Sequence, residues 1–136
     1  MTQNEKDLLI KDLCARLPYN VKVQDTYYNS FEPATIWLLD LNAQKVRLFA
    51  DEGYQSIEYI KPYLFPLSSM TEEQKNDCPI NETNLNIIKS NIGYGIIEMP
   101  WRLSYLFIDW CNKNHFDYRG LIPMGLAIDA TGLNIY

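Results

Sequence analysis

The chain has 136 residues and a mass of 15.9 kDa, which suffices for one compact domain with its own core but not for two ordinary domains. Hydrophobic residues make up 47% of the sequence and charged residues 21%, which excludes the weakly hydrophobic, highly charged class of disordered chains. The net charge is −5 and no run of lysine or arginine occurs, so we expect a single domain over residues 1–136 whose main partner is not nucleic acid.

The first predicted element is an amphipathic helix over about residues 3–16. Thr2 and Glu5 have the spacing of a capping box, and Pro18 predicts the end of the helix. One face carries the apolar residues Leu9, Ile10, Leu13, Cys14 and Leu17. The other face carries Asp7, Lys11, Asp12 and Arg16, which form two i,i+4 ion pairs in the favourable order.

From residue 21 to residue 61 the hydrophobic period changes to two, which predicts a meander of about four antiparallel strands. The expected strands lie at Val21 to Val23, Thr35 to Leu41, Val46 to Leu48, and Ile57 to Tyr59, with turns at Asn29 to Pro33, Asn42 to Gln44, and Asp51 to Gly53. The run Ile36-Trp37-Leu38-Leu39 is apolar on both faces. It therefore predicts a central strand that is covered by a helix on one side and by sheet or a partner on the other.

Two prolines, Pro62 and Pro66, are expected to end the meander. Ser69 and Glu72 then form a second capping box that predicts a short helix over residues 70–77. A further helix is predicted where Leu85, Ile88 and Ile92 recur at helical spacing, with Gly93 as its C-terminal cap.

The last predicted helix follows Pro100 and runs from Trp101 to Lys113. Its apolar residues surround almost the whole circumference, so we expect it to be largely buried. Beyond Gly120, residues Leu126 to Ala130 predict a final short strand. Together these elements predict an α+β domain in which N-terminal and C-terminal helices pack on the meander, with closure into a small barrel as an open alternative.

The turn after this helix holds the polar residues with the greatest catalytic potential. His115, Asp117 and Arg119 could supply a general base, a carboxylate and a cation for hydrolysis or phosphoryl chemistry. The alternative is structural: His115 caps the helix in its cationic form, favoured by the helix dipole, while Asp117 and Arg119 hold the turn. We favour the structural alternative and lean away from an enzyme.

No cofactor site and no specific metal site is predicted, while the seventeen acidic residues leave a magnesium site made of carboxylates alone as an open alternative. The chain has one histidine, and Cys14, Cys78 and Cys111 lack the spacing of zinc ligands or of a disulfide framework. Gly93-Tyr94-Gly95 lacks the third glycine and the lysine of a phosphate-binding loop. No apolar run reaches the about 18 residues of a membrane span and no signal peptide is evident, so we expect a cytoplasmic protein that does not enter a membrane.

Aromatic residues line the predicted strands and form the candidate interaction residues: Tyr27, Tyr28, Trp37, Tyr54 and Tyr59. They could stack with bases, contact a protein, or only form cross-strand pairs within the sheet. Because few positive charges stand near them in the sequence, we expect a protein partner. No feature of the sequence specifies an oligomeric state.

Three segments carry a resemblance: Lys-Asp-Leu-Cys-Ala-Arg-Leu-Pro-Tyr at 11–19, Ile-Lys-Pro-Tyr-Leu-Phe-Pro-Leu-Ser-Ser-Met-Thr-Glu-Glu at 60–73, and Ile-Asp-Trp-Cys-Asn-Lys-Asn-His-Phe-Asp-Tyr-Arg-Gly-Leu-Ile at 108–122. They resemble a family of small uncharacterised proteins from prophages, phages and mobile elements of gut anaerobic bacteria. This chain departs from that pattern in Cys111, where an aliphatic residue is usual, and in a longer stretch between Cys78 and Trp101. The resemblance implies an accessory protein of a mobile element or its host, without an assigned reaction.

These observations give two competing hypotheses. The first is a non-catalytic interaction or regulatory accessory protein, and it depends on the lack of cofactor, metal and nucleophile patterns. The alternative is a small hydrolase or nuclease that uses the turn of His115, Asp117 and Arg119. Nucleic-acid binding through the tyrosine-rich strands is a third hypothesis, and it predicts an affinity that falls steeply with salt.

Overall fold

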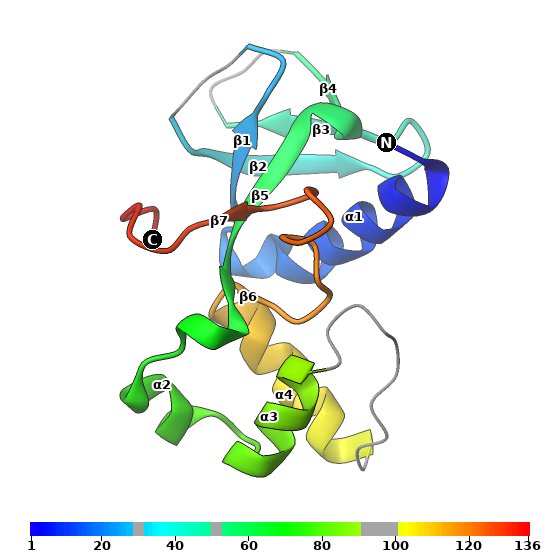
Figure 1. The fold of residues 1–136 in the computed structure, drawn as a ribbon. Helices are drawn as coiled ribbons and strands as arrows, with labels where there is room; N and C mark the ends of the chain where they lie inside the picture. Colours follow the sequence, from blue (N-terminus) through cyan, green and yellow to red (C-terminus); the bar gives the residue numbers. More distant parts are fainter. Residues whose placement is uncertain (29–31, 50–52, 91–100) are drawn as a thin grey trace.

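A twisted sheet forms one part of the molecule and a group of helices forms the other, with strand β5 running between them (Figure 1). The computed structural model describes residues 1–28, 32–49, 53–90 and 101–136, and for residues 101–104 the backbone alone. The helices are α1 (Gln3–Arg16), α2 (Glu72–Asp77), α3 (Glu82–Ser90) and α4 (Trp101–Lys113). None of the helices in the described part of the chain is long and apolar enough to cross a membrane.

The described strands are β1 (Lys22–Asp25), β2 (Ala34–Asp40), β3 (Lys45–Leu48), β4 (Gln55–Ser56), β5 (Ile60–Pro66), β6 (Phe116–Asp117) and β7 (Ile128–Asp129). They form a mixed sheet in the order β4-β3-β2-β1-β5-β6, and β7 also pairs with β5. Strands β1 to β4 form the predicted antiparallel meander, whereas β6 and β7 run parallel to β5. The α+β class is confirmed. The sheet is open, so the barrel alternative is wrong.

The second half of the sheet differs from the prediction. Residues 57–59, expected as a strand, form a short 3-10 segment. Both prolines were expected to end the meander, but β5 continues through Pro62 and ends at Pro66. The register places Pro62 opposite Val23. Gln24 and Lys61 form the neighbouring pair, and hydrogen-bonded and non-hydrogen-bonded pairs alternate. The Thr26 amide donates to the Tyr59 carbonyl, so this pair and the Gln24–Lys61 pair are the hydrogen-bonded ones. Pro62 and Val23 then form a non-hydrogen-bonded pair, in which the missing amide of proline costs no bond to β1.

Helix α1 packs on the inner face of the sheet. Its capping box is confirmed, because the Glu5 amide donates to the Thr2 hydroxyl and the Thr2 amide donates to the Glu5 carboxylate. The main core contains α1 residues Leu9 and Leu13 together with the inward residues Val23, Ile36, Val46, Leu48 and Leu64. The predicted polar face of α1 is wrong at two positions, because Asp12 and Arg16 are buried. The predicted apolar face is wrong at Cys14, which is exposed.

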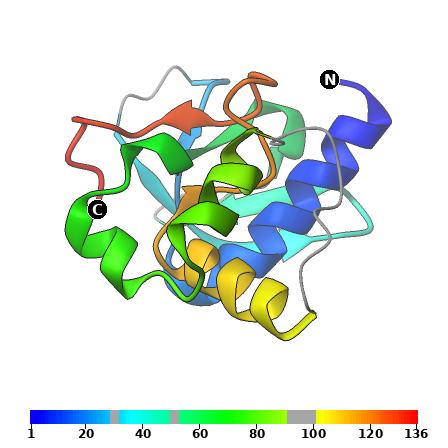
Figure 2. The ribbon, with the colours of Figure 1, turned by 60° about the horizontal axis from the view of Figure 1, so that its bottom comes forward.

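A second core lies between the remaining helices and the end of β5, and Figure 2 shows α4 beside α1 when the molecule is turned. Phe107, Cys111 and Phe116 belong to this core. The expectation that α4 is largely buried is wrong for its described side chains, because Tyr105, Leu106 and Ile108 are exposed. A helix at the edge of a small domain has fewer neighbours than its apolar circumference suggests.

The short helices begin at caps that differ in part from the predicted ones. Thr71 and Gln74 form the capping box of α2, in place of Ser69 and Glu72. The Asn81 side chain accepts the Asn84 amide at the start of α3, which contains the predicted Leu85 and Ile88. The predicted cap at Gly93, the turn at residues 93–95, and parts of the turns at 29–33 and 51–53 lie outside the described residues.

Candidate functional site

His115 lies directly beyond α4 in a left-handed backbone conformation, with φ 61°. Its amide donates to the Asn112 carbonyl (3.3 Å), and its own carbonyl accepts the Phe65 amide (2.9 Å). Its ring stacks on Tyr136 with the ring centres 3.8 Å apart. His115 therefore ends α4 through its backbone and fixes the chain beside β5.

The side chain of His115 is held in its neutral form. Burial, and to a smaller extent the nearby Arg16 guanidinium, lowers the pKa of His115 to about 4. The prediction of a cationic cap is therefore wrong, because desolvation outweighs the attraction of the helix dipole for a positive charge. Burial also raises the pKa of the Cys111 thiol, so a thiolate paired with His115 is disfavoured.

Asp117 lies on β6 and organises the connection that follows it. Its carboxylate accepts the amides of Leu121 (2.9 Å) and Ile122 (2.8 Å), one on each oxygen. Gly120 lies just before Leu121 and adopts a positive φ of 78°, a conformation that glycine takes at little cost. Asp117 also lines a cavity of about 240 Å³, whose other walls include Ser68 and Lys89 but are mainly apolar. The carboxylate is thus used to fold the loop.

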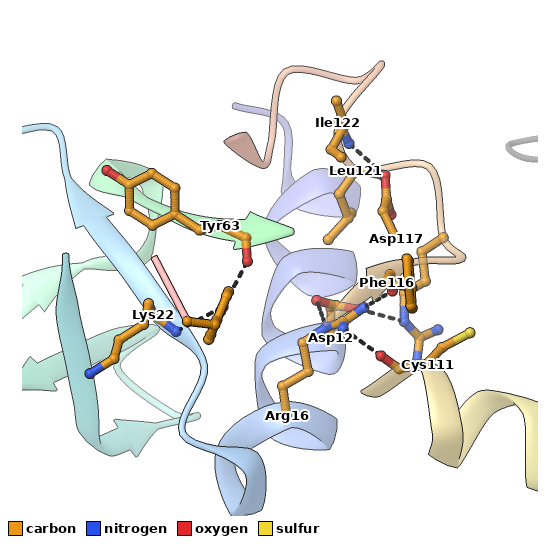
Figure 3. Close-up of polar contacts among 11 residues, drawn as sticks. Asp12, Arg16, Lys22, Tyr63, Cys111, Phe116, Asp117, Leu121 and Ile122 are labelled. Atoms are coloured by element: carbon orange, nitrogen blue, oxygen red, sulfur yellow. Dashed lines mark hydrogen bonds and ion pairs between the residues drawn. The ribbon is translucent and has the colours of Figure 1, made fainter. Parts of the chain in front are cut away.

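Arg119 belongs to a third set of contacts, centred on α1. Its Nε donates to Asp12 (3.1 Å), which is also bound by two nitrogens of Arg16, at 2.7 and 3.1 Å. Arg16 in turn donates to the carbonyl of Cys111 in the last turn of α4 and to the carbonyl of Phe116 on β6 (Figure 3). This buried polar cluster joins two of the three segments that carry the sequence resemblance.

The three candidate catalytic residues therefore have separate partners. In the described structure, no hydrogen bond or ion pair joins His115, Asp117 and Arg119 to one another. His115 contacts Tyr136, Asp117 binds the following loop, and Arg119 binds Asp12. These contacts correspond to the structural alternative for this turn, and they do not favour a hydrolase or nuclease.

The predicted interaction residues are all exposed, and they fall into two groups. Tyr27 contacts Tyr28 and Tyr59, with ring centres 5.0 and 5.1 Å apart. Trp37 and Tyr54 form the other group, where the Arg47 guanidinium lies 5.0 Å from the first ring and 6.0 Å from the second. These distances are in the range of cation–π contacts. Sequence reasoning found the aromatic rings but missed Arg47.

A bulge in β2 explains the exposure of Trp37. Ile36 pairs with Leu48, and Leu38 pairs with Arg47, so the register gives Trp37 no partner in β3. Ile36 remains 7% exposed, whereas Trp37 and Leu38 are 58% and 38% exposed. Helix α1 covers one face of this strand, as expected, and the extra residue turns two consecutive apolar side chains outward on the other face. Cover by a second sheet is absent there among the described residues, and cover by a partner stays a prediction. We call Trp37, Leu38, Arg47 and Tyr54 the outer sheet surface.

Among the residues that the structure describes, no metal-binding group is found, that is, no cluster of three or more histidine, cysteine, aspartate or glutamate side chains that could hold a metal ion. The Cys14, Cys78 and Cys111 thiols are free. Comparison of the chain with protein-family models, with curated protein sequences and with solved structures gave no match.

Proposed function

We propose that this chain is a non-catalytic interaction or regulatory protein, and that it binds a macromolecular partner through the outer sheet surface. The observation that carries the proposal is the bulge at Trp37, which directs Trp37 and Leu38 outward from the middle of the sheet. Bulges re-aim side chains at the expense of regular pairing, and exposed tryptophan, tyrosine and arginine are the residue types enriched where proteins bind partners.

The surface also has an ordered arrangement before any partner binds. Arg47 lies close to both Trp37 and Tyr54, which restricts the rotamers of all three side chains. Restricting side chains in advance lowers the entropy that binding costs. The position of the surface supports the same role, because α1 covers the opposite face of the sheet and leaves this face open.

The resemblance to phage and mobile-element proteins supports an accessory role in such an element or its host. The turn after α4 supports the non-catalytic part of the proposal, because its polar side chains are used in structural contacts. His115 stacks on a ring, Asp117 accepts backbone amides, and Arg119 donates to a buried carboxylate. The sequence predicts a protein as the partner that binds this surface.

The experiment is retention of partners from an extract of the native host on the immobilised protein. Three proteins are compared: the wild type, the double variant Trp37→Ser with Leu38→Ser, and the control Tyr105→Ser. Tyr105 is an equally exposed aromatic residue on α4. The proposal predicts a species that the wild type and the control retain and the double variant loses. Equal retention by all three proteins, or retention of nothing, would contradict it.

A further inference from the structure

Basic residues that are far apart in the sequence come together on the outer face of the sheet. Directly opposed residues of antiparallel strands lie on the same face, and the inward residues are those packed on α1. The pairs Lys22 with Thr35, Leu38 with Arg47, and Asp40 with Lys45 therefore face outward. The same alternation places Lys61 of β5 outward, opposite Gln24.

The outer face is consequently much more basic than the chain as a whole. It carries Lys22, Lys45, Arg47 and Lys61, four of the twelve lysines and arginines of a protein with net charge −5. Among the described strand residues of β1, β2, β3 and β5, the outward carboxylate is Asp40, which accepts the amides of Asn42 and Ala43 in the adjacent turn. Glu32, just before β2, is also exposed.

This arrangement removes the reason for preferring a protein partner, which was the scarcity of positive charge near the aromatic residues. Building on the proposed function, we infer that the outer sheet surface binds single-stranded nucleic acid. Trp37 and Tyr54 stack with bases, while Arg47 and the surrounding lysines contact phosphates. A sheet face with exposed rings and cations suits unpaired bases, because every base offers a face for stacking and every linkage offers a negative charge.

A single strand fits this face better than a duplex. The bases of a duplex are stacked on one another, so rings at a strand surface cannot reach their faces. Among residues 1–28, 32–49, 53–90 and 101–136, no helix projects from this face to enter a groove, since α1 packs on the inner face of these strands. The rest of the protein is acidic and repels a polyanion, so we expect moderate affinity that depends strongly on salt.

The experiment measures fluorescence anisotropy of a labelled oligo(dT) 12-mer and an oligo(U) 12-mer against the full chain. Four contacts between cations and phosphates give a slope of about −2.8 for log K against log salt. Raising the salt from about 50 to about 200 mM should therefore weaken binding about fiftyfold. Trp37→Ala should weaken binding by about fivefold to 140-fold through the lost stacking, and Lys45→Ala should reduce the slope by about 0.7.

Matched controls separate this surface from unspecific attraction. Tyr105→Ala and Lys113→Ala remove an exposed ring and an exposed cation from α4, and both should bind the 12-mers like the wild type. Polyglutamate, a polyanion without bases, should bind weakly and should be insensitive to Trp37→Ala. Equal affinity for polyglutamate and the 12-mers would overturn the inference, as would tighter binding to a duplex of the same length.

The two proposals fail in different ways. If the 12-mers do not bind at low salt, but the Trp37→Ser with Leu38→Ser variant still loses a protein that the wild type and Tyr105→Ser retain, the occupant is a protein. The nucleic-acid inference is then wrong and the proposed function stands. If the 12-mers bind equally to the wild type and to Trp37→Ala, they bind elsewhere and the nucleic-acid inference is wrong. The proposed function is then decided by the retention experiment, and equal retention by the wild type and the double variant would contradict it.

Discussion

Asp12 and Arg16 form an ion pair with both side chains fully buried, one turn apart on α1, with the closest nitrogen and oxygen 2.7 Å apart. Arg16 also donates to two carbonyls, from Nη1 to Cys111 and from Nη2 to Phe116, 95 and 100 residues later in the chain. A helix leaves its last carbonyls without partners, and here a charged donor from another helix binds the Cys111 carbonyl in the last turn of α4 and the Phe116 carbonyl on β6. The pair therefore connects the N-terminal helix to the second core.

Removing one member of this pair should be costly. In Arg16→Met, the Asp12 carboxylate keeps Arg119 as its charged partner but loses two bonds. The Cys111 and Phe116 carbonyls each lose a bond from Arg16, and the Phe116 carbonyl keeps the Tyr118 amide. We expect the free energy of unfolding to fall by about 3–5 kcal/mol, measured by urea denaturation. The control Lys75→Met breaks the exposed pair with Glu72 and should cost less than about 1 kcal/mol. Similar losses in the two variants would contradict this role of Arg16.

His115 should make stability depend on pH in a defined window. Its pKa is about 4 in the folded state and near 6.5 when exposed, so the unfolded state binds more protons between these values. The stability it contributes is complete above about pH 6.5 and is lost as the pH falls towards 4. After allowance for solvent screening we expect a loss of about 1–3 kcal/mol, measured by denaturation at several pH values.

The matched variant is His115→Asn, because asparagine tolerates the left-handed backbone at this position and does not titrate. Its loss of stability between pH 6.5 and 4 should be smaller than that of the wild type by the amount His115 contributes. Parallel pH profiles for the two proteins would show that His115 is not the titrating group.

Asp117→Asn should destabilise the loop after β6. The amide group has one acceptor oxygen, so one of the amides of Leu121 and Ile122 loses its partner and faces an NH₂ group. A cost of about 1.5–3 kcal/mol is expected for a hydrogen bond to a charged group, together with faster hydrogen exchange of these two amides. In the control Asp129→Asn, the affected carboxylate oxygen accepts the exposed Thr131 amide, and the cost should be below about 1 kcal/mol.

Two neighbouring residues of β2 test the bulge. Ile36→Ala removes a side chain from the main core and should cost about 2–5 kcal/mol, whereas Trp37→Ala removes an exposed ring and should cost about 1 kcal/mol or less. Urea denaturation of both variants measures the difference. A larger cost for Trp37→Ala than for Ile36→Ala would place Trp37 in the core and exclude the outer sheet surface as a binding site.

The hydroxyl of Tyr136 completes the ladder between β1 and β5. It accepts the Lys22 amide (3.1 Å) and donates to the Tyr63 carbonyl (2.8 Å), where the register would otherwise pair these two residues directly. Tyr136→Phe keeps the ring on His115 but leaves both backbone groups without this partner. We expect a loss of about 1–3 kcal/mol and faster exchange of the Lys22 amide. Unchanged exchange there would contradict the bridging role.

Local chemistry in the sequence was enough to predict several elements. The capping box at Thr2 and Glu5, the helix over residues 3–16, and the period-two segments of β1, β2 and β3 were all recognisable, because caps and periodicity depend on residues within a few positions of one another. Strands β6 and β7 have two residues each, which is too short for a periodic pattern, and β7 was found only as part of the longer predicted strand.

The sequence by itself determined the α+β class and the position of α1, and it singled out the aromatic candidates, since each follows from local spacing and composition. Whether those aromatic side chains face the core or solvent was decided by the tertiary structure. Only the tertiary structure decided that Asp12 and Arg16 are buried, that His115 is neutral, and that Pro62 lies within a strand. It also decided that three lysines and an arginine from three strands, β1, β3 and β5, share one face with Trp37. Burial, strand register and the bulge depend on contacts between distant residues, and no local pattern specifies them.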